Sequence, residues 1–181
     1  MRVLGDAVGL DNSSLYRHFP SKAALIDGVL DRAAGDVFAA IAPFIDPVAP
    51  LTLSSLEDIG AAAARYLFDH PSTARLIVHW IMSMGEERGG VRIRVPATDK
   101  RRPGGKLLSL LRARLDDAAK NGRLRKHATP EALVILIGVA VVRPATYGHL
   151  FKTLEPKRTR AQARAAWEQE LRAAIRGAFK P

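Results

Sequence analysis

Apolar residues recur at helical spacing along nearly the whole of this chain, and this limits its possible folds more than any other property. Between residues 22 and 42 they fall three and four positions apart, at Leu25, Ile26, Val29, Leu30, Ala33, Val37, Phe38 and Ile41. This spacing places them on one face of an α-helix. There is no convincing run of alternating apolar and polar residues with hairpin turns, the pattern of exposed strands. The sequence therefore predicts an all-α fold.

Residues that cap or break helices divide the pattern into segments. The predicted helices cover, approximately, residues 2–8, 14–19, 22–42, 51–69, 72–84, 106–120, 131–151 and 160–179. Gly9 is expected to end the first helix, and Ser54 with Glu57 is expected to form a capping box at the fourth. Residues 85–105 are rich in glycine, proline and arginine, which predicts a long loop.

The helices are expected to form two parts. Residues 1–42 would be a head, made of two short helices and a long connecting helix. Three prolines between residues 43 and 50 then predict a linker. Residues 51–181 would be a larger helical body.

The two short helices of the head have the layout of a helix-turn-helix, in which the second helix enters the major groove of DNA. Leu15 and Phe19 are four residues apart and are expected to form its buried stripe. The outer side and start of that helix would carry Asn12, Ser13, Ser14, Tyr16, Arg17 and His18. The alternative is a helical hairpin that exposes the same Tyr-Arg-His face without binding DNA.

Residues 9–25, GLDNSSLYRHFPSKAAL, resemble the signature of the tetracycline-repressor (TetR) family of transcriptional regulators. The matching positions are Leu15, Tyr16, His18, Phe19, Ser21, Lys22 and Leu25. The resemblance implies that Tyr16 and His18 touch phosphate or a thymine methyl group, and that Lys22 binds phosphate. It implies that Asn12, Ser13, Ser14 and Arg17 face the bases, where asparagine and arginine can make bidentate contacts.

The same resemblance implies an architecture and a mechanism. The chain would be a dimer with a truncated helix-turn-helix head and a helical-bundle body that binds a small apolar or amphipathic effector. The dimer would bind a palindromic double-stranded DNA operator as a repressor, with activation as the other possibility. The effector would release the operator by tilting the connecting helix.

Members of that family carry a further amphipathic helix before this segment, whereas Met1 stands at the start of what resembles their second helix. Without that cover, we expect Val3, Val8, Leu15 and Phe19 to be partly exposed, and operator affinity to be weak or absent. The alternative function is therefore a TetR-like helical protein that binds a small molecule and does not bind DNA.

Side chains suited to an adaptable apolar pocket occur in the body. The candidate ligand-binding residues are Tyr66, Phe68, His79, Trp80, Met82, Met84 and Tyr147. Each of them, taken singly, is more readily explained as an ordinary core residue, and each histidine as a packed or surface residue. Residues 131–151 and 160–179 are expected to form the homodimer interface as a four-helix bundle, although burial of the first within one subunit would explain its apolar sequence too.

The formal net charge of +10 suggests a polyanionic partner. Its distribution weakens that argument, because residues 1–32 carry four basic and four acidic side chains. Residues 88–126 carry thirteen basic and three acidic side chains. The basic loop within that stretch could attract an anion such as a coenzyme-A thioester or DNA, or could simply be a solvated segment.

Several classes of function are disfavoured. The chain has no cysteine, and its histidines, at positions 18, 70, 79, 127 and 149, are scattered; we therefore expect no metal site and no cofactor. No nucleophile motif, phosphate loop or acidic dyad indicates an enzyme. The most apolar run, residues 132–142, is too short to span a bilayer, and no signal peptide is evident. We expect a cytoplasmic protein without membrane contact.

Overall fold

The structure is a computed structural model that describes residues 5–7, 9, 11–46, 48–82, 87–88, 91–92, 103–126, 128–129, 132, 136, 153 and 157–181. Its helices are α2 (Asn12–His18), α3 (Lys22–Ile41), the 3₁₀ turn η1 (Ala42–Phe44), α4 (Leu53–Asp69), α5 (Pro71–Met82), α6 (Pro103–Lys120) and α9 (Arg160–Phe179). The strands β1 (Glu87–Arg88) and β2 (Val91–Arg92) form a two-residue antiparallel pair. The predicted all-α fold is therefore confirmed, with this one short pairing inside the expected loop.

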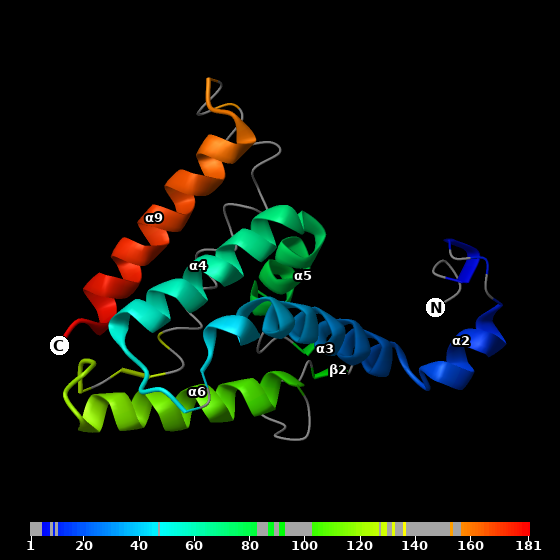
Figure 1. Cartoon of the computed structure of the whole chain (residues 1–181). Helices are drawn as coiled ribbons and strands as arrows, with labels where there is room; N and C mark the ends of the chain where they lie inside the picture. Colours follow the sequence, from blue (N-terminus) through cyan, green and yellow to red (C-terminus); the bar gives the residue numbers. More distant parts are fainter. Residues whose placement is uncertain are drawn as a thin grey trace.

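The helices form a body from which α3 projects (Figure 1). The C-terminal third of α3 packs with α4 and α6 through Phe38 and the buried Ile41. Its N-terminal half extends away from them and carries α2 at its end (Figure 1). Ser21 begins α3 by accepting a hydrogen bond from the backbone N–H of Ala24 at 3.0 Å.

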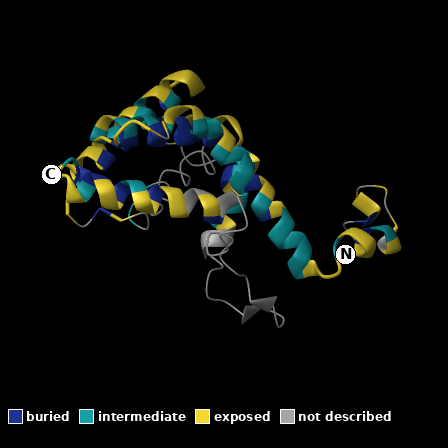
Figure 2. Cartoon of the chain, turned by 60° about the horizontal axis from the view of Figure 1, so that its bottom comes forward, coloured by how far each residue is buried: buried dark blue, intermediate teal, exposed yellow. Residues whose placement is uncertain are grey.

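The main core lies where α4, α6 and α9 face one another. Figure 2 shows the buried residues gathered between these helices, while the projecting half of α3 is mostly half-buried. The largest fully buried side chains of this core are Leu56, Ile59, Leu115, Leu124, Ile175 and Phe179. Their burial supplies most of the apolar stabilisation of the body, at about 25 cal/mol per Å² removed from water.

Helices α4 and α9 pack closely because the sequence places a glycine at their contact. A Cβ atom at Gly60 would lie 2.3 Å from Cδ1 of Ile175. Ion pairs then join the two helices along their length: Glu57–Arg176, Asp58–Arg172, Arg65–Glu168 and Asp69–Arg164. In these pairs the α4 number rises as the α9 number falls, so they fix an antiparallel register.

Several predicted boundaries are confirmed and others are corrected. Helix α9 has the predicted bounds, and Gly9 and Gly122 have the positive φ of helix-ending glycines, 69° and 68°. Helix α2 begins two residues earlier than predicted, because Asp11 is its N-cap. Helix α6 begins at Pro103, inside the predicted loop.

The capping box predicted at α4 was wrong. Thr52 is the N-cap, and it exchanges hydrogen bonds with Ser55. Glu57 is instead buried beneath α9, where its carboxylate accepts two hydrogen bonds from Arg176 at 2.8 and 2.9 Å.

Two predicted helices fall largely outside the described residues. In the first, over residues 2–8, positions 5–7 are described and are helical. In the helix predicted over 131–151, only positions 132 and 136 are described, and both are helical.

Candidate nucleic-acid interface

Helix α2 is short, and its first turn is organised by one carboxylate. Asp11 accepts hydrogen bonds from the backbone N–H of Ser14 at 2.7 Å, from the Ser13 hydroxyl at 2.6 Å and from the Ser14 hydroxyl at 3.2 Å. These bonds, that of the Ser13 hydroxyl first, hold the pKa of Asp11 below its usual value. The sequence indicated Asp11 as a cap, but it gave no sign that the same carboxylate engages both serines.

One side of α2 faces inward and the other faces solvent. Leu15 is buried, with 6 % of its surface exposed. On the outer side Tyr16 is 50 % exposed, and Ser13, Arg17 and His18 are exposed as well. Ser14 is half-buried, and Asn12 lies in α2 although its side chain is outside the described part of the structure.

A contact between an aromatic ring and a glycine joins α2 to α3. Phe19 follows α2 directly, and a Cβ atom built at Gly28 would lie 3.0 Å from its Cε1 atom. Gly28 therefore allows the ring to lie against the backbone of α3. A glycine inside a predicted helix costs about 1 kcal/mol relative to alanine, and this cost is the sequence signal that could have indicated the contact.

Lys22 completes the candidate interface. It is the first residue of α3 and is exposed, next to the capping Ser21. The structure thus exposes Tyr16, Arg17 and His18 at consecutive positions of α2, and places Lys22 at the adjacent helix start, where backbone N–H groups and the helix dipole favour anions. These four residues are here called the α2 face.

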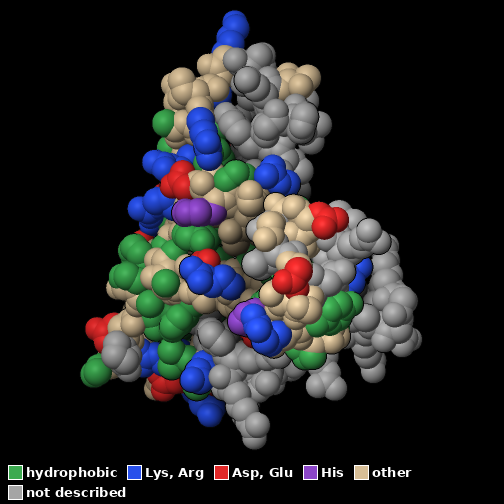
Figure 3. Space-filling model, turned by 90° about the vertical axis from the view of Figure 1, so that its right-hand side faces the viewer, with side chains coloured by type: hydrophobic (Ala, Val, Ile, Leu, Met, Phe, Trp, Pro, Cys, Tyr) green, Lys and Arg blue, Asp and Glu red, His purple; other side chains and the backbone are tan. Residues whose placement is uncertain are grey.

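The charge around the α2 face is mixed. Figure 3 views the molecule from the end that bears α2, and basic and acidic side chains are interspersed there. Asp11 lies at the start of α2 itself. This agrees with the equal numbers of basic and acidic side chains in residues 1–32. Any nucleic-acid binding by this face would depend on individual contacts more than on bulk charge.

The expected exposure of apolar residues in the head needs one correction. Leu15 is buried within the chain as it stands, because it turns toward the inner side of α2. Phe19 is half-buried, in agreement with the expectation. Val3 and Val8 lie outside the described residues. Some apolar surface does remain open on the projecting half of α3, where Val29 is 43 % exposed.

The structure does not assemble the predicted ligand pocket from the residues it describes. Tyr66 stacks on His70, with ring centroids 4.1 Å apart, and packs with a small cluster around Leu67 and Ala74. Phe68 is buried toward α9, where the guanidinium of Arg160 lies 5.6 Å from its ring centroid.

The remaining ligand-binding candidates give little information about a pocket. His79 is exposed on α5. Trp80 and Met82 also belong to α5, but their side chains, like Met84 and Tyr147, lie outside the described part of the structure. The effector pocket therefore stays a prediction.

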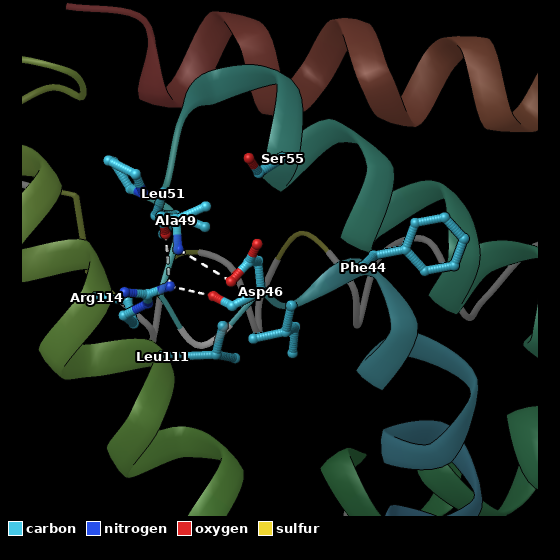
Figure 4. A pocket seen from close by; sticks show the side chains of 9 residues that line it. Phe44, Asp46, Ala49, Leu51, Ser55, Leu111 and Arg114 are labelled. Carbon is cyan, nitrogen blue, oxygen red and sulfur yellow. Dashed lines mark hydrogen bonds between the residues drawn. The ribbon is translucent and has the colours of Figure 1, made fainter.

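A described cavity lies elsewhere, between the α3–α4 linker and α6 (Figure 4). It is lined by Phe44, Ile45, Asp46, Ala49, Pro50, Leu51, Ser55, Leu111 and Arg114. Its volume is about 40 Å³. This is room for one or two water molecules, whereas drug-sized ligands occupy pockets of about 300 Å³ or more.

The predicted dimer interface is described only in part. Helix α9 buries Ala163, Leu171, Ile175 and Phe179 within its own chain. Its outward surface carries exposed small residues in two pairs with a spacing of four: Ala161 with Ala165, and Ala173 with Gly177. The helix predicted over 131–151 lies mostly outside the described residues, so the dimer also stays a prediction.

Comparisons with protein-family models, with curated proteins and with solved structures found no match to this chain. Within the described ranges, no helix is both long and apolar enough to cross a membrane. Across the same part of the chain, no group of three or more histidine, aspartate or glutamate side chains is placed to hold a metal ion.

Proposed function

We propose that this chain is a ligand-responsive transcriptional regulator of the TetR type, a repressor that binds a palindromic operator as a homodimer. The observation that carries the proposal is the α2 face, which lies at the end of a projecting helix. A reading helix must be free of its own protein in order to enter the major groove. Helix α2 has this freedom, because its buried residue Leu15 points inward while Tyr16, Arg17 and His18 point outward.

The chemistry of the α2 face suits the two kinds of contact that such a protein needs. Arg17 can make a bidentate contact with a guanine edge, which specifies sequence. Lys22 and the N–H groups at the start of α3 suit a phosphate, which fixes the position of the protein on the duplex. The long α3 would link this face to an effector-binding body, so that an effector could change the spacing of two reading helices.

Selection from a pool of random DNA duplexes at low salt tests the proposal. We expect enrichment of a palindromic sequence, and a dissociation constant for that duplex that rises steeply with salt. Arg17→Ala should weaken binding by about 1–3 kcal/mol and relax the preference at one base pair. Lys22→Ala should weaken binding to all sequences and reduce the salt slope by about one.

Lys120→Ala is the matched control, because it removes one exposed cation from the end of α6, far from α2 (Figure 1). It should leave both the affinity and the preference unchanged. If the unaltered chain enriches no sequence, DNA recognition by this chain is refuted. The second candidate, a helical protein that binds a small molecule without DNA, would then be favoured.

A further inference from the structure

The path of the linker between α3 and α4 is held by arginine side chains from α6 and from the turn that follows it. The Nη2 nitrogen of Arg114 donates hydrogen bonds to the carbonyl oxygens of Asp46 and Ala49, the second at 2.7 Å (Figure 4). The Nε nitrogen of Arg123 donates to the carbonyl oxygen of Leu51 at 3.3 Å. These bonds join residues that are 65 to 72 positions apart in sequence.

The linker also forms a turn that is held by one of its own side chains. One carboxylate oxygen of Asp46 accepts hydrogen bonds from the backbone N–H groups of Val48 and Ala49, at 2.7 and 2.9 Å. The described residues of the linker, 45–46 and 48–52, form no helix or strand, and Val48 and Ala49 are exposed. Its conformation therefore depends on the Asp46 turn and on Arg114, which are here together called the linker clamp.

Because of its position, the linker clamp can affect where α2 lies. It lies directly after the end of α3 that is packed in the body, where Ile41 is buried. Helix α3 has twenty residues and is therefore about 30 Å long. A change of roughly 10° in its direction at the clamp would move its far end by about 5 Å. That displacement is large compared with the tolerance of contacts to base edges.

We propose that Arg114 is a positioning residue: together with the direct packing of α3 on α4 and α6, the linker clamp fixes the direction of α3 relative to the body, and a displacement of α6 is transmitted through Arg114 and the linker to α3 and so to α2. The inference rests on the proposed function, in which α2 reads DNA. The cavity beside the clamp supports it, because a void of about 40 Å³ next to Arg114 leaves room for the linker to shift without a clash.

Distances between two spin labels measure the direction of α3 without any ligand or DNA. The chain has no cysteine, so Val29→Cys on α3 and Ser72→Cys on α5 create two unique, exposed labelling sites away from the outward surface of α9, and dilution with unlabelled chain removes distances between protomers. We expect a narrow distance distribution in the labelled parent. Arg114→Met should broaden or shift it by several ångströms, and Arg114→Lys should largely restore it, because an ammonium group can still donate to the linker carbonyls.

Two further variants separate coupling from a general loss of structure. Asp46→Ala opens the linker turn without touching α6, and should broaden the distribution in the same way. Lys106→Met is the control, because it removes an exposed cation from the same helix away from the linker, and should leave the distribution unchanged. A distribution that is unchanged in folded Arg114→Met and Asp46→Ala would overturn the proposal.

Binding to the selected duplex provides the functional test. Arg114→Met should weaken binding about fivefold or more, at the lower end of typical coupling between sites, although Arg114 lies outside the α2 face. Unchanged affinity in a variant with a broadened distance distribution would refute the coupling to DNA reading. If the unaltered chain binds no DNA, the proposed function fails, and the distance measurement alone still decides whether Arg114 sets the direction of α3.

Discussion

Glu57 is the one charged residue of the described chain that is buried, and its environment predicts how the stability of the fold depends on pH. The two hydrogen bonds from Arg176 lower its pKa below the ordinary value of 4.5, against the opposing effect of burial. A lowered pKa in the folded state stabilises the protein above the unfolded value, and this stabilisation is lost as the pH falls through the folded value. We therefore expect the contribution to be complete at neutral pH, to begin to fall near pH 4.5 and to be lost as the pH passes below the lowered pKa of the folded state.

Glu57→Gln should lower the free energy of unfolding at pH 7 by about 2 kcal/mol, because it removes a charged acceptor and leaves a buried amide. Urea unfolding at pH 7 and at pH 3 measures this, and the difference between the two proteins should shrink at the lower pH. Asp58→Asn is the control. Asp58 pairs with Arg172 at 2.8 Å but is 44 % exposed, so its loss should cost less than about 1 kcal/mol. Equal costs for both substitutions would contradict the importance of burial.

Gly60 gives the second prediction at this scale. A methyl group there would lie 2.3 Å from Cδ1 of Ile175, which is fully buried. Gly60→Ala should therefore destabilise the chain by about 1–3 kcal/mol through overpacking, although alanine favours a helix. Gly35 has no neighbouring atom within 4 Å of the corresponding position, so Gly35→Ala should stabilise α3 by up to about 1 kcal/mol.

A double-mutant cycle identifies the cause. Ile175→Val removes the Cδ1 atom, so the cost of Gly60→Ala should be much smaller in that background than in the unaltered chain. Thermal unfolding of the four proteins provides the comparison. Additive costs would show that the methyl group and Ile175 do not compete for the same space.

At the scale of elements, the start of α4 shows what the sequence could and could not predict. The pattern Ser54–Glu57 has the residues of a capping box, but Thr52–Ser55 is the box that forms. Leu51 and Leu56, which stand before the cap and at the fourth helical position, are both buried in the main core. These are the positions of a hydrophobic staple, so the correct start was present in the sequence. A glutamate three residues after a serine is the more familiar capping-box pattern, so the local pattern alone favours Ser54.

This correction can be tested directly. Thr52→Ala should cost about 1 kcal/mol, because it leaves the backbone N–H of Ser55, in the first turn of α4, without its partner. Ser54→Ala should be close to neutral, since Ser54 is an exposed residue inside the helix. Chemical unfolding of the two variants discriminates between the two starts. If Ser54→Ala lowered the free energy of unfolding more than Thr52→Ala, Ser54 and not Thr52 would be the N-cap of α4.

Other elements were predictable for a clear physical reason. Helix α3 and helix α9 carry apolar residues at helical spacing between clear breakers, and their observed bounds agree with the prediction to within one residue. The contacts that hold the candidate site were not predictable in the same way. The pairing of Arg114 with the linker spans more than sixty positions, and the approach of Phe19 to Gly28 depends on how two helices cross. A local sequence pattern does not reveal contacts between residues that are far apart in the chain.

At the scale of the whole molecule, the distribution of charge and the arrangement of the helices distinguish the head from the body. The basic excess of the chain lies in residues 88–126 and in the C-terminal part, whereas residues 1–32 have no net charge. The head is joined to the body only through α3 and its linker in the described structure (Figure 1). An arrangement of this kind suits a reading helix whose direction is controlled where α3 packs on the body.

Such a reader would act in pairs, and α9 offers a surface for pairing. Its inward face is used by α4, while Ala161, Ala165, Ala173 and Gly177 are exposed on the outward side. Small residues permit close approach of a second helix, and a twofold pair would place two reading helices about one DNA turn apart, roughly 34 Å. We expect the unaltered chain to be a dimer at micromolar concentration.

Ala173→Glu should convert that dimer into a folded monomer, because it places a bulky charge in the interface while glutamate remains a good helix former. Ala113→Glu makes the same change at an exposed position of α6 and should leave the dimer intact. Sedimentation equilibrium gives the masses, and circular dichroism shows that the helices persist. If the unaltered chain is monomeric, or if Ala173→Glu dimerises as well as Ala113→Glu, pairing through α9 is wrong, and with it the geometry by which two α2 faces would read a palindrome.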